Sequence, residues 1–220
     1  MTREWLATQF KNDPPKSPFA PTWDYTIAEK QIDIDIELLK NIVLEKEIEI
    51  VQQYPANSDG GTGLGSKSLT SRFKYFNLLE WDYEVVKDLH QEIKKFHSQY
   101  TKSLFGFNYT HPTLYIRCWA NVMRKNQKIN KHFHSIHPHT YIGGHLSVQC
   151  CDTSTVYVNP YDDKNLYYSE NKPGKLTLFP NYIPHYTTKH TIEEPRITIA
   201  FDITPLSRIF VDDKVDLLQL

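Results

Sequence analysis

The second half of this 220-residue chain is a series of short segments in which apolar and polar residues alternate. Alternation with a period of two is typical of β-strands that bury one face, and several such strands in series favour a sandwich or an open barrel. The 14 Tyr and 11 Phe add to the tendency to form strands. The alternating segments are 113–123, 145–150, 155–158, 175–179 and 196–203. They predict a β core between residues 113 and 203.

Two helical patterns precede this β region. Apolar residues recur at helical spacing from residue 36 to about residue 50, and Asp35 suits the helix N-terminus. A second helix is expected over residues 82–104, where one apolar stripe is formed by Leu89, Ile93, Phe96 and Tyr100. Helices that come before the strands in sequence favour a helical layer packed on the outside of the β core.

The length of the chain fits one domain. Pro14, Pro15, Pro18 and Pro21 exclude a helix or a central strand near the N-terminus. We therefore predict a single domain over residues 1–220. Its parts are a proline-rich arm with a first strand (1–33), a helical layer with a glycine-rich loop (34–112), the β core (113–203) and a C-terminal tail (204–220).

Charge and cysteine content exclude several kinds of partner. The formal net charge is −1, so no overall field favours nucleic acid or an anionic membrane. Cys118, Cys150 and Cys151 predict no disulfide framework, and they suit a reducing compartment. The charged N-terminus lacks the apolar run of a signal peptide, and no stretch is long enough to span a bilayer. We expect a cytoplasmic protein without a membrane partner. The sequence has no clear nucleic-acid signal, although its overall charge leaves a local basic groove open. No feature indicates its oligomeric state.

Histidines concentrate just before the Gly143-Gly144 pair, and two of them form the sequence His132-Phe-His134. Residues i and i+2 of a strand point to the same face, so this pair directs two imidazoles at one point. His185 follows 53 residues after His132, behind a predicted strand and two prolines. Three protein ligands on one side leave the other positions of an octahedral iron open, as iron oxygenases require.

A cosubstrate site is predicted from Arg196 and Thr198, which share one face of the last strand. A keto acid that chelates iron leaves one position for O₂ and needs a cationic partner for its far carboxylate. Arginine suits this role because its planar fork makes two charge-assisted hydrogen bonds. Asn121 is a further candidate, because asparagine is unfavourable inside a sheet and a buried Asn121 would need a polar partner.

Taken in order, these motifs resemble the iron(II)- and 2-oxoglutarate-dependent oxygenases, in particular a branch common in bacteria and phages. The resemblance covers roughly residues 34–203. The motifs are Trp119-x-Asn121, His132-x-His134, Gly143-Gly144, Gly174-x-Leu-x-Leu-Phe-Pro180, His185 and Arg196-x-Thr198.

The resemblance implies a fold, two cofactors and a reaction. The fold would be mainly β with α, a double-stranded β-helix (jelly-roll, cupin-like) core with N-terminal helices outside. The cofactors would be iron(II) on His132, His134 and His185, and 2-oxoglutarate on Arg196 and Thr198. The reaction would be hydroxylation of a C–H bond by O₂, with release of succinate and CO₂. The substrate would be a small molecule or a peptide.

One departure from the family pattern leaves the metal ligands open. The wider superfamily has His-x-Asp or His-x-Glu, whereas this chain has His134 at the acidic position. Either His134 is the third ligand, or that ligand is absent, or a distant acid such as Asp152 replaces it. His137-Pro-His139 is a rival pair. The bulk of His134 disfavours halogenation, because halogenating relatives have a small residue at this position.

Two other functions stay open beside the oxygenase. One is a cupin-like enzyme with a three-histidine metal and no 2-oxoglutarate, and the other is an inactive β-helix that serves as a binding module. His145 and His190 are expected to be structural polar residues. The glycine-rich loop has the spacing of a phosphate-binding loop from Gly60 to Gly65, but Ser66 stands in place of the essential lysine. We expect a flexible loop near the site entrance.

Overall fold

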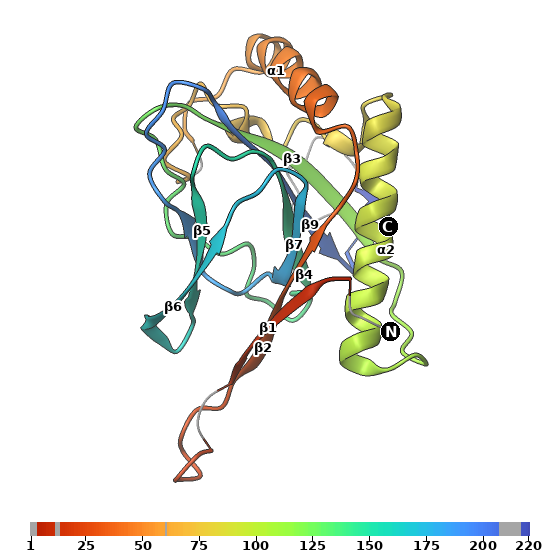
Figure 1. The fold of residues 1–220 in the computed structure, drawn as a ribbon, viewed down its shortest axis with the longest axis vertical. Helices are drawn as coiled ribbons and strands as arrows, with labels where there is room; N and C mark the ends of the chain where they lie inside the picture. Colours follow the sequence, from red (N-terminus) through yellow and green to blue (C-terminus); the bar gives the residue numbers. More distant parts are fainter. Residues whose placement is uncertain (1–3, 12–13, 60, 207–216) are drawn as a thin grey trace.

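Two antiparallel sheets enclose the central part of the molecule (Figure 1). The computed structural model describes residues 4–11, 14–59, 61–206 and 217–220. The larger sheet has the strand order β1 (Leu6–Lys11), β2 (Asp24–Gln31), β7 (Lys175–Pro180), β4 (Ile142–Gln149), β9 (Arg196–Thr204), β3 (Tyr115–Met123), β10 (Leu218–Gln219). The smaller sheet has the order β6 (Asp162–Glu170), β5 (Ser154–Asn159), β8 (His185–Thr187). The two sheets form the predicted double-stranded β-helix, without closing into a barrel.

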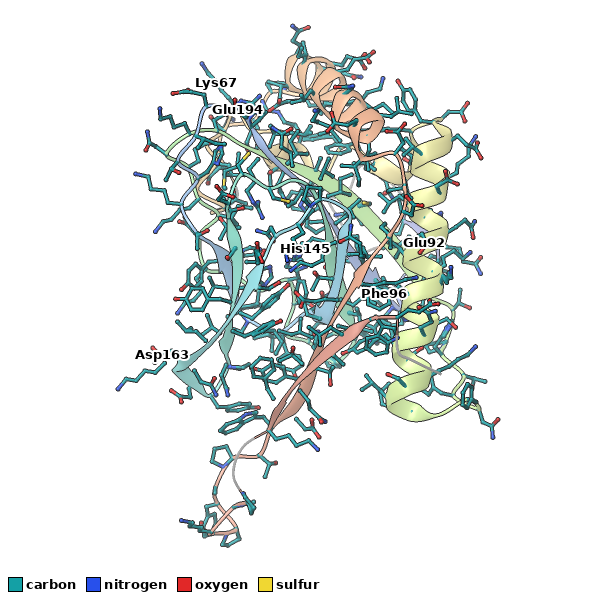
Figure 2. The ribbon with its side chains drawn as sticks, viewed as in Figure 1. Lys67, Glu92, Phe96, His145, Asp163 and Glu194 are labelled. Atoms are coloured by element: carbon teal, nitrogen blue, oxygen red, sulfur yellow. The ribbon has the colours of Figure 1, made fainter. Side chains whose placement is uncertain are left out.

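The two predicted helices are confirmed, and they lie outside the larger sheet (Figure 1). In α1 (Ile36–Gln53), the carboxylate of Asp35 accepts a hydrogen bond of 2.9 Å from the backbone N–H of Leu38, which caps the helix. In α2 (Glu84–Phe105), every member of the predicted apolar stripe is buried, and Phe96 lies between the helix and the sheet (Figure 2). Short 3₁₀ turns at Thr70–Arg72 and Leu78–Glu80 connect the helices.

Strand pairing brings more of the chain into the sheets than the alternating segments predict. The proline-rich arm contributes β1, an edge strand that pairs with β2, and Phe10 stacks on Tyr25 with ring centroids 4.8 Å apart. The prolines lie in the connection after Lys11, where they remove no ladder hydrogen bond. Strand β6 was not predicted, because both of its faces are mostly exposed and its sequence lacks alternation. Of the predicted tail, residues 207–216 lie outside the described residues.

We expect Leu89→Ala to lower the free energy of unfolding by about 2–5 kcal/mol, because it leaves a cavity under α2. Leu89 is fully buried in the core between the helix and the sheet. Leu104→Ala is the matched control on the same helix, since that side chain is 43% exposed. Urea denaturation of both variants would measure the difference. Equal losses in the two variants would contradict this account of the core.

Candidate metal and cosubstrate site

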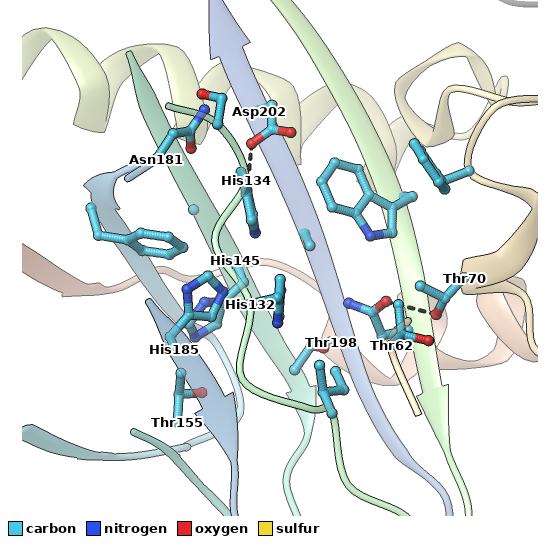
Figure 3. A pocket seen from close by; sticks show the side chains of 18 of the residues that line it. Thr62, Thr70, His132, His134, His145, Thr155, Asn181, His185, Thr198 and Asp202 are labelled. Atoms are coloured by element: carbon cyan, nitrogen blue, oxygen red, sulfur yellow. Dashed lines mark hydrogen bonds and ion pairs between the residues drawn. The ribbon is translucent and has the colours of Figure 1, made fainter. Parts of the chain in front are cut away.

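A cavity of about 220 Å³ lies between the two sheets and holds most of the residues singled out in the sequence (Figure 3). Its walls come from β3, β9 and β4 of the larger sheet, from β5 and β8 of the smaller sheet, and from the segment 129–139. Thr62 places the glycine-rich loop beside the same cavity. A cavity with apolar walls and a few convergent polar groups is the usual form of a small-molecule site.

His132, His134 and His185 meet in this cavity. One ring nitrogen from each lies within 4.8 Å of the others. His132 and His185 exchange two backbone hydrogen bonds of 3.0 and 2.8 Å, which form an isolated β-bridge. The rings of His132 and His134 are nearly parallel at 15°. The prediction that this pair lies on a continuous strand is wrong, because a single bridge fixes the segment, yet the two rings still point the same way.

The rear nitrogen of each imidazole is held by an oxygen. His132 Nδ1 lies 2.8 Å from the carbonyl oxygen of Asn130, and His185 Nδ1 lies 3.0 Å from that of Ile183. A carbonyl oxygen only accepts, so both Nδ1 atoms carry the proton and both Nε2 atoms present a lone pair. This tautomer is the one that ligates a metal through Nε2.

Two of these histidines are neutral at pH 7. Burial lowers the pKa of His132 to about 4, with a further lowering from the neighbouring His134. Burial also holds the pKa of His185 well below its usual value. Neutral imidazole is the metal-binding form, so no proton has to leave these two rings before a cation binds.

The third histidine has a carboxylate behind it. His134 Nδ1 lies 2.5 Å from Asp202 Oδ1 on β9 (Figure 3). The sequence interpretation missed Asp202, although a signal was present, because Arg196, Thr198 and Asp202 are separated by even numbers of residues on one strand. Even spacing puts all three on the same face of the sheet. This chain lacks the acid that the family pattern has at position 134, but it has a carboxylate behind His134 instead.

Arg196 is fully buried at the other end of the cavity. Its Nε donates a 2.8 Å hydrogen bond to Thr153 Oγ1, whereas its Nη1 has no partner among the described residues. Burial lowers the pKa of the guanidinium to about 10, so it remains charged at pH 7. Thr198 lies two residues along the same face and also lines the cavity. A buried cation with an open donor fits a carboxylate, so these residues suit the far end of a keto acid.

A chain of polar side chains fixes Arg196 from behind. Asn171 Nδ2 donates 3.2 Å to Thr153 Oγ1, and Asn171 Oδ1 accepts 3.0 Å from Thr155 Oγ1. Asp152, the distant acid considered above, has a positive φ of 54° in the turn that delivers Thr153. It lines a separate depression with Cys151 and does not join the three histidines.

His145 was expected to be a structural polar residue. It lines the cavity, and its buried Nε2 has no partner among the described residues. Burial, followed by the charge of Arg196, lowers its pKa to about 3, so the ring is neutral at pH 7. His190, for which we expected the same role, does not line the cavity, and its Nε2 lies 2.6 Å from the backbone oxygen of Glu194. His145 is therefore a further polar group within the cavity.

Asn121 and the rival histidines lie farther from the three ring nitrogens that converge. Asn121 Oδ1 accepts a 2.7 Å hydrogen bond from Thr70 Oγ1, so its amide is already anchored at the cavity wall. His137 and His139 line the cavity too, but both are exposed and neither joins the group of ring nitrogens. These two histidines are bonded to each other, because the Nδ1 atom of His137 accepts a hydrogen bond from the backbone N–H of His139.

The backbone N–H groups of the glycine-rich loop are bonded to a carboxylate of the same loop. Asp59 accepts hydrogen bonds from the backbone N–H groups of Gly61, Gly63 and Gly65 at 2.9, 2.9 and 3.2 Å. These three bonds hold the pKa of Asp59 below its usual value. A phosphate-binding loop directs such N–H groups at its ligand. Here they are used within the loop, which disfavours phosphate binding.

The fold resembles several solved oxygenases. A prolyl-4-hydroxylase from Pseudomonas putida superposes with a TM-score of 0.56 at 11% identity, over 81% of this chain and 91% of that one. HygX from Streptomyces hygroscopicus, solved with nickel and 2-oxoglutarate bound, has a TM-score of 0.52 at 12% identity, over 88% and 92%. The search of curated proteins found no match. At these identities the likeness concerns the fold.

A family profile connects the sequence to the same group of enzymes. Its description is "Putative 2OG-Fe(II) oxygenase", and it matches residues 145–202, which include His185 and Arg196 but not His132. This partial match and the likeness in fold together support a relation to the 2-oxoglutarate- and iron(II)-dependent oxygenase superfamily. The description of that profile includes iron(II) and 2-oxoglutarate, the two cofactors that the sequence motifs predict for His132, His134, His185 and Arg196. Among its described residues, no helix is long and apolar enough to cross a membrane.

A glycine at the start of β4 gives the ring of His134 its space in the cavity wall. A Cβ atom on Gly143 would lie 2.1 Å from Asn181 Oδ1 and 3.0 Å from His134 Nδ1. Only a residue without a side chain lets both groups approach the strand so closely. The glycine pair singled out in the sequence thus has a steric task beside the metal-binding candidates.

We expect Gly143→Ala to lower the free energy of unfolding by about 1–3 kcal/mol, the usual cost of overpacking a filled site. Urea denaturation would measure it. Ser135→Ala is the control, because Ser135 lines the same cavity and its hydroxyl contacts only Thr140 at 3.2 Å among the hydrogen bonds of the described residues. An alanine at position 143 that leaves stability unchanged would show that His134 and Asn181 have room to move.

Proposed function

We propose that this oxygenase hydroxylates a C–H bond of its substrate, with His132, His134 and His185 as iron ligands and Arg196 and Thr198 as the cosubstrate anchor. The single observation that carries the proposal is the shared cavity. It contains ring nitrogens that converge at one end and a buried guanidinium with an open donor at the other. This arrangement supports a ligand that bridges a metal and a cation, as 2-oxoglutarate does.

Each residue has a defined task under this proposal. Bound iron(II) and 2-oxoglutarate supply the activation of O₂, and the chain supplies binding, orientation and electrostatics. The three imidazoles present Nε2 lone pairs on one side, which leaves the opposite side for cosubstrate and O₂. Arg196 neutralises the far carboxylate, and Thr198 adds a hydroxyl beside it. His145 offers a hydrogen-bonding group in the same cavity, and because its ring is neutral it adds no charge.

Aromatic side chains shield the end of the cavity that holds the three histidines from water. Phe179 is 1% exposed and lies edge-on to His134 and His185, with ring centroids 5.7 and 4.7 Å away. Trp119 on β3 covers the other side of His134 at 5.7 Å. Apolar walls exclude water, which strengthens the electrostatic interactions inside and protects reactive species from side reactions.

The two alternative functions are less well supported. A three-histidine enzyme without 2-oxoglutarate leaves Arg196 Nη1, which has no partner among the described residues, without a ligand, although burying an unpaired donor is costly. A binding module without metal gives no reason for imidazoles that converge with their Nδ1 atoms tied to oxygens. The oxygenase reaction uses both features, and this is why we favour it.

Anaerobic titration with iron(II) and then 2-oxoglutarate tests the assignment. We expect the wild-type protein to develop the weak visible charge-transfer band of a chelated keto acid. His185→Ala should bind iron at least 10-fold more weakly and lose the band, because it removes one of three ligands. Iron binding without a band would favour the enzyme that lacks 2-oxoglutarate, and failure to bind iron would favour the binding module.

Arg196→Ala separates the two ends of the cavity. It should leave iron(II) binding intact and weaken 2-oxoglutarate by about 10- to 100-fold, the effect of losing a charged hydrogen bond of 1.5–3 kcal/mol. Thr62→Ala is the matched control, since Thr62 lines the cavity but its hydroxyl bonds only within the glycine-rich loop among the described residues. Unchanged 2-oxoglutarate affinity in the Arg196 variant would remove that residue from the cosubstrate site.

Thr153→Val tests whether the polar chain behind Arg196 matters for the cosubstrate. Valine keeps the shape of threonine but removes the oxygen that accepts from Arg196 and from Asn171. We expect 2-oxoglutarate affinity to fall by about 5- to 30-fold, the equivalent of roughly 1–2 kcal/mol for a buried donor left unsatisfied. Isothermal titration in the presence of manganese(II) would measure it. Thr177→Val is the matched control, because the buried hydroxyl of Thr177 has no partner among the described residues. Unchanged affinity would mean that Arg196 holds its position without this support.

A further inference from the structure

We propose that Asp202 acts through His134 as part of one composite metal ligand, and that it supplies the negative charge which the three imidazoles lack. This inference rests on the proposed metal site and extends it to a residue outside the ligand set. Asp202 would be a positioning and charge-donating residue, since it contacts His134 and no other member of the converging group.

The charge distribution in the cavity motivates the proposal. Neutral imidazoles bring no charge to a divalent cation, and Arg196 adds a positive charge to the same enclosed space. Asp202 is the only acidic residue among the described residues that line the cavity. A cation in a low-dielectric site interacts far more strongly with a nearby carboxylate than it would in water. Asp202 is therefore the available counter-charge.

The contact itself is close and largely shielded. His134 Nδ1 and Asp202 Oδ1 are 2.5 Å apart, and their side chains are 7% and 16% exposed. A hydrogen bond to an ionised carboxylate is shorter and stronger than one to a neutral acceptor. The proton on Nδ1 is thus shared with an anion, which makes the opposite nitrogen a better electron donor to a metal.

Backbone contacts hold both partners of this pair. Asp202 lies in the middle of the larger sheet, opposite Arg117 on β3 and Gly143 on β4. The backbone N–H of His134 donates 2.9 Å to the carbonyl oxygen of Asn181, which places the ring above β9. Figure 3 shows the Asp202 carboxylate directed at His134, on the side away from His132 and His185.

The three histidines are not equivalent in this respect. His132 and His185 have backbone carbonyl oxygens behind them, and His134 alone of the three has a carboxylate. A carbonyl is enough to fix a tautomer and a ring orientation. A carboxylate does the same and also adds a full charge, so its presence at one position indicates a task beyond orientation.

The test compares two substitutions that separate charge from hydrogen bonding. Asp202→Asn keeps an oxygen that accepts from Nδ1–H but removes the charge, and Asp202→Ala removes both. Titration calorimetry on the full chain would measure the affinity for manganese(II) without 2-oxoglutarate. We expect affinity to fall about 10- to 100-fold in both variants, the range for lost carboxylate partners of ligating histidines. Asp24→Asn, at an exposed carboxylate of β2, is the matched control and should change nothing.

A second readout addresses the ligand itself. The visible spectrum of the cobalt(II) form reports how strongly the ligands donate, and we expect its bands to shift in Asp202→Asn while the thermal unfolding temperature stays close to wild type. If Asp202→Ala fails to fold, Asp202→Asn alone still gives both measurements, because it preserves shape and the acceptor atom.

The outcomes distinguish this inference from the proposed function. Wild-type binding with weakened Asp202→Asn binding supports the composite ligand. If the wild-type protein binds manganese(II) and Asp202→Asn binds it equally well, the composite ligand is overturned and the three-histidine site stands. This holds whether or not Asp202→Ala binds more weakly. A wild-type protein that binds no metal ion overturns both.

Discussion

The pairing of β9 between β3 and β4 is the interaction on which the site depends. Its register places Thr198 opposite Asn121 and Ser147, and Asp202 opposite Gly143. Because alternate residues of a strand share a face, one strand holds Arg196 and Thr198, the proposed cosubstrate anchor, and the carboxylate of Asp202 at a fixed separation. A slip of one residue would turn all of them out of the cavity, so the buried outer face of β9 also secures the chemistry of its inner face.

Local patterns predicted the parts of the fold that local physics determines. Both helices follow from their apolar stripes, and the main strands follow from alternation between residues 113 and 203. Strand β6 was not predicted, and one strand was expected in residues 1–33, where the structure has both β1 and β2. Pairing partners, and not their own burial patterns, make β1 and β6 strands. A single sequence does not indicate which distant segment will supply the backbone hydrogen bonds of such a strand.

The site shows the same division between local and distant information. The spacing of His132, His134, His185 and Arg196 was readable because each residue belongs to a short motif, and the structure brings all four to one cavity. Asp202 and Thr153 were not found, since each bonds to a residue far away in the sequence, and the place of His145 in the cavity depends on how the strands pair. Such supporting groups become visible only when the strands are placed side by side.

The depth of the cavity also constrains the order in which ligands bind under the proposed assignment. Arg196 is 1% exposed, whereas His137 and His139, which line the same cavity, are exposed to solvent. Arg196 therefore lies deeper than the rim formed by His137 and His139. If Arg196 binds the far carboxylate of 2-oxoglutarate, as proposed, this ligand has to enter past that rim. We therefore expect 2-oxoglutarate to bind before a substrate that covers His137 and His139.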